Sequence, residues 1–250
     1  MSDPGLPVDW PAPQAVGAFC STRDGGVSNG PYATLNLGDH VGDEAAAVAV
    51  NRSRFAQMLC VRPVYMQQVH GTDVVRLDRD SPDGLRADAC WTDQRGIACT
   101  IMVADCMPLL FATADGRLAG AAHAGWRGLA GGVIEKLWDA LREQGADASR
   151  TTAWLGPCIG PDAFEVGEDV RDAFGSDGTR AVAFFKPTGG GKFLADLPGL
   201  ARKRLHALGL TGISGNDGTS AWCTVANPSR FFSHRRDRIS GRFAAAAWLR

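Results

Sequence analysis

The sequence predicts one domain of the α/β class, and three observations support this prediction. The chain has 250 residues, 45% of them hydrophobic and 21% charged, which is ordinary for a single globular domain with a large core. Its central part holds several short apolar runs, and residues 97–104 are apolar enough for a strand buried on both faces. Residues 129–141 and 197–208 instead repeat apolar side chains at helical spacing.

The expected elements follow one another without an internal repeat or a linker, so we expect a tail at residues 1–12 and one domain at residues 13–250. The first signals predict a strand at 16–21, a helix at 44–59 capped by Asp43, and strands at 64–69, 74–77 and 97–104. The later signals predict a hairpin of strands at 107–113 and 117–124, a helix after Gly128, a strand at 152–155, helices at 167–174 and 197–208, and a strand at 231–237.

The composition excludes several classes of protein. A formal net charge of −1 provides no overall attraction to nucleic acid or to an anionic membrane. No apolar stretch is long enough to span a bilayer, and the first residues lack the basic and apolar regions of a secretory signal. Seven cysteines without a Cys-x-x-Cys pair fit neither a disulfide framework nor a zinc finger. We therefore expect a cytoplasmic enzyme or binding protein.

Three residues at the edges of apolar runs are the candidate catalytic groups, namely His70, Cys106 and His123. The Asp-Gly pair at 115–116 predicts a hairpin in which Pro108 faces His123. Cys106 is then a diagonal neighbour of His123 on the same face, about 7–8 Å away at the backbone. A thiolate and an imidazole can therefore converge at this place.

These three side chains are open to several chemical interpretations. Two imidazoles and a thiolate form a zinc site whose fourth position is free for water. They alternatively form a blue-copper site with Met107 as axial ligand, although adjacent strand residues point to opposite faces. A further alternative is a nucleophilic Cys106 with His123 or His70 as base and Asp105, one step off in the strand, as its orienting group. The remaining alternatives are ordinary core residues and a structural metal, which normally needs a fourth protein ligand.

Arg127, Arg235 and Arg236 are candidate ligands for phosphate or carboxylate, because a guanidinium group grips either anion with two parallel hydrogen bonds. Arg127 lies in a Gly-bounded turn at the start of a helix, where free N–H groups and the helix dipole favour an anion. Arg52 and Arg235 are expected to assist it, and a solvated surface position is the alternative for each. Residues 188–192 superficially resemble a phosphate-binding loop, but they lack its full pattern and favour a turn.

Six short motifs occur in order between about residues 22 and 242, which is nearly the whole chain. They are Gln67-Gln68-Val69-His70-Gly71, Ala87-Asp88-Ala89 with Thr92, Ala104-Asp105-Cys106-Met107-Pro108, His123-Ala124-Gly125-Trp126-Arg127-Gly128, Gly156-Pro157-Cys158-Ile159-Gly160, and Ser233-His234-Arg235-Arg236-Asp237 with Gly241-Arg242. This series resembles the YfiH-like family, whose members are also called laccase-domain proteins, polyphenol oxidases or peptidoglycan editing factors. One departure is His234, where the family often has Tyr or Trp.

The resemblance implies a single α/β domain in which β-sheets are sandwiched between helices. It also implies a zinc site at His70, Cys106 and His123, with copper as the less favoured metal. The implied partners are purine nucleosides and phosphate, without nucleic acid or membrane. The implied reactions are phosphorolysis of adenosine, inosine and methylthioadenosine, and deamination of adenosine at the same site.

The other family names imply two alternative activities. One is a Cys–His hydrolase that removes a wrongly incorporated amino acid from a peptidoglycan precursor, with Cys106 as nucleophile. The other is a copper-dependent polyphenol oxidase. A multicopper oxidase needs a type 1 copper and a trinuclear cluster built largely from imidazoles, and five histidines are few for that purpose. Deamination needs only an open zinc and a proton carrier, so the sequence favours the nucleoside enzyme.

Overall fold

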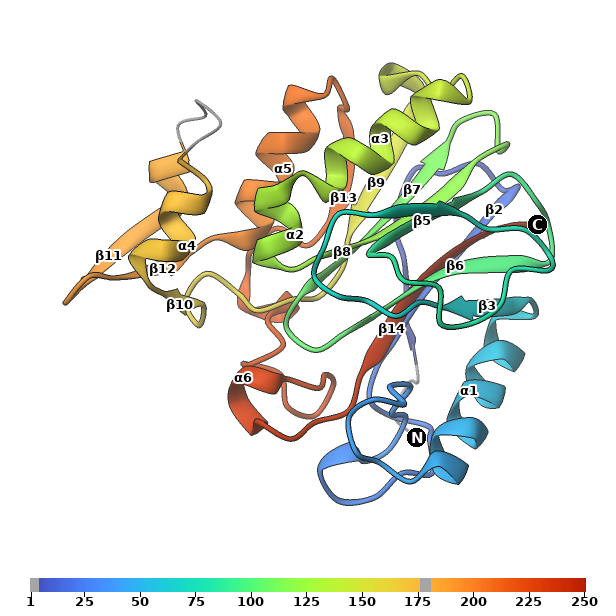
Figure 1. The fold of residues 1–250 in the computed structure, drawn as a ribbon, viewed down its shortest axis with the longest axis horizontal. Coiled ribbons are helices and arrows are strands. Elements are labelled where there is room, and N and C mark those ends of the chain that lie inside the picture. Colours follow the sequence, from blue (N-terminus) through green and yellow to red (C-terminus); the bar gives the residue numbers. More distant parts are fainter. Residues whose placement is uncertain (1–4, 176–180) are drawn as a thin grey trace.

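Two large β-sheets are stacked in the structure, a computed structural model that describes residues 5–175 and 181–250 (Figure 1). The five-stranded sheet has the order β1 (Gly5–Leu6), β2 (Val16–Ser21), β14 (Phe243–Leu249), β6 (Ile97–Val103), β3 (Arg62–Tyr65). The six-stranded sheet has the order β13 (Gly212–Gly215), β9 (Thr151–Leu155), β7 (Met107–Thr113), β8 (Ala119–Ala124), β5 (Ala89–Thr92), β4 (Val74–Arg76). A small third sheet contains β10 (Glu165–Val166), β12 (Lys192–Ala195) and β11 (Phe185–Gly189).

Helices cover the outer faces of the two large sheets (Figure 1). The helix α1 (Ala45–Leu59) packs on the five-stranded sheet, whereas α2 (Trp126–Gly131), α3 (Val133–Glu143) and α5 (Leu197–Ala207) pack on the six-stranded sheet. Two shorter helices, α4 (Glu168–Ala173) and α6 (His234–Asp237), complete the set among the described residues. The predicted α/β domain with sheets sandwiched between helices is therefore confirmed. None of these helices is long and apolar enough to cross a membrane.

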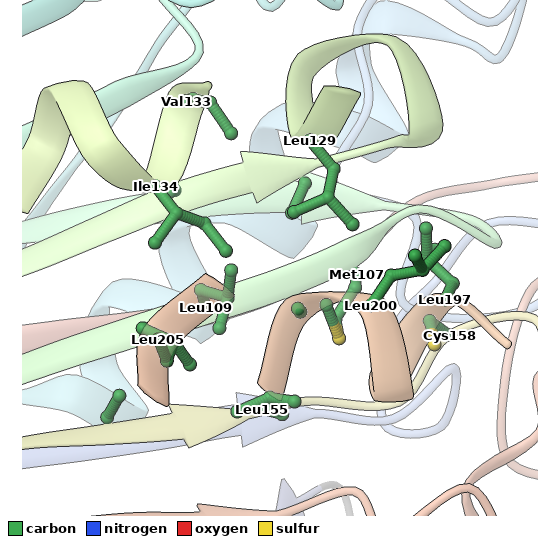
Figure 2. Packing of buried hydrophobic residues seen from close by; sticks show 14 of the residues in the cluster. Met107, Leu109, Leu129, Val133, Ile134, Leu155, Cys158, Leu197, Leu200 and Leu205 are labelled. Atoms are coloured by element: carbon green, nitrogen blue, oxygen red, sulfur yellow. The ribbon is translucent and has the colours of Figure 1, made fainter. Parts of the chain in front are cut away.

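The core consists of three buried layers, and strand alternation distributes side chains among them. In β6, Ile101 faces the space between the two sheets, whereas Met102 packs toward α1. All of β6 is buried, as the sequence predicted for a strand covered on both faces. Figure 2 shows the third layer, in which Leu109 of β7, Ile134 of α3 and Leu205 of α5 belong to one cluster.

Several bounds differ from those expected because loops leave the sheets early. β3 and β4 are shorter than the strands expected at 64–69 and 74–77, since the chain between them forms the loop that carries His70. Within residues 188–192, Gly190 and Gly191 form the turn that joins β11 to β12, as the sequence favoured. Part of the segment expected as a tail, residues 1–12, pairs with β2 as β1.

Two helix starts also differ from the expectation. The N-cap of α1 is Glu44 instead of Asp43, because the Asp43 carboxylate accepts hydrogen bonds from two loop side chains. The helix expected to start after Gly128, at Leu129, begins three residues earlier, at Trp126. Gly132 adopts a left-handed backbone with φ 93° and divides the helical stretch into α2 and α3.

The strand expected at 231–237 is wrong, because this segment contains the short helix α6. Ser233 starts it, and its hydroxyl accepts a hydrogen bond from the Arg236 N–H at 3.2 Å. The last strand is instead β14, whose sequence is Phe-Ala-Ala-Ala-Ala-Trp-Leu. Alanine favours helices, but here its pairing with β2 and β6 on both edges overrides that preference.

The β7–β8 hairpin has the predicted register, with Pro108 opposite His123. At its tip, the Asp115 carboxylate accepts hydrogen bonds from the Thr113 hydroxyl at 2.7 Å and from the Arg117 guanidinium at 2.8 Å. These bonds, first that from Arg117 and then that from Thr113, lower the pKa of Asp115 to about 2. The tip is thus closed by an ionised carboxylate.

We expect Asp115→Asn to destabilise the protein slightly at neutral pH and less in acid. A carboxyl group with a lowered pKa stabilises the fold above its ordinary value of 3.8 and loses this effect as the pH falls toward about 2. Because the side chain is partly exposed, the difference should be about 0.5 kcal/mol or less, or roughly 1–2 °C in Tm. Thermal melting should show a constant difference from neutral pH to about pH 5 that shrinks below about pH 4. A difference that grows in acid would contradict this assignment.

Candidate metal and catalytic site

Three side chains from separate segments converge at one place. His70 lies in the loop before β4, Cys106 in the turn between β6 and β7, and His123 near the end of β8. The two ring nitrogens and the sulfur that face one another all lie within 4.8 Å. Within residues 5–175 and 181–250, this is the one cluster of His, Cys, Asp or Glu with a spacing suited to a metal ion.

The backbone of Gly125 makes room for this cluster. A Cβ atom on Gly125 would lie 2.7 Å from the Cys106 Sγ and 3.2 Å from the His70 ring. The φ of Gly125 is −68°, which any residue can adopt. The requirement for glycine at this position is therefore one of space and not of backbone conformation.

Asp88 organises both histidines from the start of β5. Its fully buried carboxylate accepts hydrogen bonds from the backbone N–H groups of Val69 at 3.1 Å, His70 at 2.9 Å and Gly71 at 2.7 Å. It also lies 2.8 Å from the His123 Nδ1. A carboxylate at Nδ1 fixes the imidazole tautomer and leaves Nε2 for a metal or a proton.

The electrostatics of the cluster favour a charged pair. Burial raises the pKa of the Cys106 thiol, but the imidazoles of His123 and His70 outweigh this effect and bring it to about 6. Burial lowers the pKa of His123, whereas the Cys106 thiolate and the Asp88 carboxylate raise it to about 9. A thiolate is the form of cysteine that both binds metals and attacks substrates.

Asp105 fastens the turn that carries Cys106, and it does not orient a histidine. Its carboxylate accepts hydrogen bonds from the Thr224 hydroxyl and the Arg235 backbone N–H, both at 2.6 Å. Its carbonyl accepts a third from the Ile159 N–H at 2.9 Å. The φ of Asp105 is 88°, a strained conformation that these three contacts stabilise.

A cavity of about 380 Å³ lies over the three convergent residues. Its apolar wall, as we call it, consists of Trp126, Ile159, Phe164 and Leu197. Its basic side chains, apart from the cluster itself, are His40, His234, Arg235, Arg238 and Arg242. The volume is in the range of sites for small ligands, and the lining combines apolar contact with positive charge.

Of the arginines expected to bind phosphate, which are Arg127, Arg52, Arg235 and Arg236, only Arg235 lines this cavity. Arg127 is exposed and stacks on Trp126, with its Cζ 4.3 Å from the ring centroid. Because α2 begins at Trp126, the first turn places Arg127 outside and Gly128 inside, against the backbone of the His70 loop. Arg127, expected as a phosphate ligand, therefore lies outside the cavity lining.

Arg52 also lies outside the cavity lining, and its guanidinium is already engaged. It donates to the Leu37 carbonyl at 2.9 Å and pairs with Asp39 at 3.1 Å, and it stacks on Tyr65. Sequence reasoning assigned no role to Asp88 or Arg242, although both stood in the motifs that it singled out. Their signal was a polar residue at a strand start, where a side chain can reach the end of the sheet.

The fold and the site together define a laccase-domain protein with a His–Cys–His cluster, and the chain belongs to this family. The family model described as multi-copper polyphenol oxidoreductase laccase matches residues 17–250. A purine nucleoside phosphorylase of Pseudomonas aeruginosa is 48% identical over 245 residues, which cover 98% of both chains. The purine nucleoside phosphorylase YfiH of Escherichia coli is 45% identical over 242 residues, 96% of both chains.

Two solved structures are similar to this chain over nearly its whole length. A Neisseria meningitidis protein has a TM-score of 0.93 at 44% identity, and the match covers 99% of both chains. YlmD from Geobacillus stearothermophilus has a TM-score of 0.90 at 31% identity, with 100% of this chain and 97% of the other covered. The similarity in sequence and in fold therefore extends over the entire domain.

We expect Gly125→Ala to damage the cluster more than the fold. The added methyl group displaces the Cys106 sulfur, and an ångström-scale displacement of a reacting group can lower turnover by about a hundredfold. Overpacking should cost about 1–3 kcal/mol in the free energy of unfolding. Zn²⁺ titration measures the damage to the cluster, and urea unfolding measures the change in the free energy of unfolding. Gly131→Ala is the control, since its nearest new neighbour is a Thr72 methyl group at 3.0 Å, and wild-type Zn²⁺ affinity in Gly125→Ala would refute the steric argument.

We expect Asp88→Asn to weaken metal binding by about 10- to 100-fold, the usual effect of losing a carboxylate that supports a ligating histidine. Its amide group also cannot accept all four hydrogen bonds, which should cost about 1–3 kcal/mol of stability. The matched control is Asp93→Asn, because Asp93 is an exposed carboxylate that pairs with Arg76. Equal metal affinity in the two variants would contradict the role of Asp88.

Proposed function

We propose that this protein is a zinc-dependent purine nucleoside phosphorylase that acts on adenosine, inosine and methylthioadenosine and also deaminates adenosine. The observation that carries the proposal is the cavity of about 380 Å³, which unites a metal-capable cluster, an apolar wall and several cations. A nucleoside needs apolar contact for its base, and phosphate needs positive charge. The names of the relatives, which are called purine nucleoside phosphorylases, support the same proposal.

The donor set suits zinc better than a group of coppers. His70, Cys106 and His123 provide two nitrogens and one sulfur, and they leave a fourth position open. Bound there, zinc would supply a Lewis acid next to the substrate. A multicopper oxidase needs several ligand clusters, but the part of the chain that the structure describes contains this cluster alone. Copper therefore remains the less favoured metal despite the name of the family model.

Several residues of the chain have binding or positioning roles in the proposed phosphorolysis. An oxygen of hydrogen phosphate forms a bond with C1′ of the ribose, the C1′–N9 bond breaks, and the purine leaves with the electron pair and takes up the proton that the phosphate gives up. The apolar wall is suited to hold the purine and exclude bulk water. Arg235, which stacks on Phe164 of this wall, is our proposed contact to phosphate. Asp88 keeps His123 in one tautomer throughout.

A second candidate function is hydrolysis by Cys106 as a nucleophile, as in removal of an amino acid from a peptidoglycan precursor. The observation that favours it is the series Cys106, His123 and Asp88, which matches a nucleophile, a base and an orienting carboxylate. In this reaction the thiolate would attack an acyl carbon, the C–N bond would break, and the amine would leave with a proton from His123. Water would then hydrolyse the resulting thioester and restore the thiolate. The two candidates differ in their need for metal and in the covalent adduct.

The decisive experiment is product analysis after incubation with adenosine, with and without phosphate, using zinc-loaded and chelator-treated protein. We expect adenine only with phosphate and inosine under both conditions, and neither product after chelation until zinc is restored.

Cys106→Ala should lose both zinc and turnover while its thermal melting remains cooperative, because the residue is replaced by a smaller one at the edge of the cavity. Full turnover by the chelated protein, or an acyl adduct on Cys106, would favour the hydrolase instead.

A further inference from the structure

Arg242 is a partly buried cation of the cavity wall that no carboxylate of the described residues neutralises by direct contact. Its Nη1 donates hydrogen bonds to the carbonyls of Ser240 at 2.9 Å and Gly241 at 3.0 Å. Its Nε and Nη2 have no partner among the described residues, so one edge of the planar guanidinium is free for a ligand. Burial lowers the pKa of Arg242, and the more distant Cys106 and Asp105 only partly offset this effect.

The sheet places Arg242 near the catalytic cluster. Arg242 immediately precedes β14, whose first residue, Phe243, pairs with Val103, the last residue of β6. From Val103 the chain continues through two residues to Cys106. The start of β14 and the end of β6 thus place Arg242 and Cys106 at the same end of these two neighbouring strands.

The stem of Arg242 is held rigidly. Its N–H donates to the Asn36 Oδ1 at 2.8 Å, and its carbonyl accepts from the Leu37 N–H at 2.9 Å. Gly38 packs so closely on the side chain that a Cβ there would lie 2.8 Å from the Arg242 Cγ. A guanidinium that is fixed before the ligand arrives loses little entropy on binding, which favours affinity.

The other arginines of this region are less suited to bind an anion with two hydrogen bonds. Arg235 donates from Nη1 to the Glu165 carbonyl at 3.1 Å. Arg52 is paired with Asp39 outside the cavity lining. Arg238 is exposed, so an anion bound there remains in competition with water. A partly buried guanidinium with a free edge gains most from an oxyanion, because pairing offsets its lost hydration.

We propose that Arg242 binds inorganic phosphate in the cavity and holds it for the reaction with the nucleoside. This proposal rests on the proposed phosphorylase function and extends it, because it assigns the main phosphate contact to Arg242. The free edge formed by Nε and Nη2 matches two oxygens of one phosphate. Arg235, at the apolar wall, then plays the lesser part in phosphate binding.

The test is calorimetric binding of inorganic phosphate to zinc-loaded protein without nucleoside. Arg242→Gln should lower phosphate affinity by about 10- to 100-fold, as expected for loss of a charge-assisted contact. Arg242→Lys keeps the charge but loses the two-pronged geometry, so it should lie between Arg242→Gln and the wild type. Arg142→Gln is the control, because Arg142 is exposed and pairs with Asp139 on α3. Zinc content should be equal in all four proteins.

Kinetics separate a binding role from a structural one. In Arg242→Gln, the KM for phosphate should rise by the same factor, while the KM for adenosine and the rate of deamination change little. Phosphate affinity equal to that of the wild type would overturn the proposal. An equal loss of deamination and phosphorolysis would also overturn it, because Arg242 would then support the site as a whole.

Two further outcomes keep this proposal distinct from the proposed function. Phosphate binding that depends on Arg242, in a protein that releases no adenine from adenosine, would retain the anion site and reject the phosphorylase. Phosphorolysis with an unchanged KM for phosphate in Arg242→Gln would retain the phosphorylase and reject Arg242. Competition with adenosine monophosphate tests whether the site binds free phosphate or the phosphate group of a nucleotide. If adenosine monophosphate displaced phosphate with much higher affinity, the site would belong to a nucleotide and the assignment to free phosphate would be wrong.

Discussion

The buried carboxylate of Asp88 is the interaction on which the site depends. It binds three successive N–H groups of the His70 loop and, at the same time, the imidazole of His123. The loop has left the sheet and the φ of His70 is 60°, so at His70 these three hydrogen bonds take the place of strand pairing. Asp88 is itself fixed, because its carbonyl accepts the His123 N–H at 2.7 Å. One side chain therefore sets the distance between two histidines from distant segments.

The local part of this arrangement could be predicted from the sequence. The Asp-Gly turn determines the register of β7 and β8, and with it the approach of Cys106 to His123. Alternation likewise predicted that β6 is buried on both faces. These predictions succeed because turn chemistry and strand periodicity act between residues that are near in sequence. The position of His70 could not be predicted in this way. It depends on the contact between the Asp88 carboxylate and the N–H groups of the loop, which forms only in the folded chain.

The errors concern places where tertiary contacts outweigh local signals. Arg127 follows the glycine turn as predicted, but a helix that starts three residues earlier than expected directs it to solvent. The alanine run of β14 carries no strand signal, yet β14 occupies the centre of a sheet and places Arg242 beside the cavity. A motif can thus mark a position as chemically important without indicating which way its side chain points.

The charge distribution bears on the proposed function, in which one cavity would serve two different reactions. The Cys106 thiolate, the Asp88 carboxylate and the His123 imidazole contact one another within the cluster, and no arginine of the cavity pairs directly with them among the described residues. The positive field of these arginines is left for an anionic reactant, as phosphorolysis requires. The proposed deamination would use neutral water at the same cluster and would need no such field. Under the proposed function, the arginines of the cavity would therefore affect phosphorolysis more than deamination, whereas Asp88 would support both.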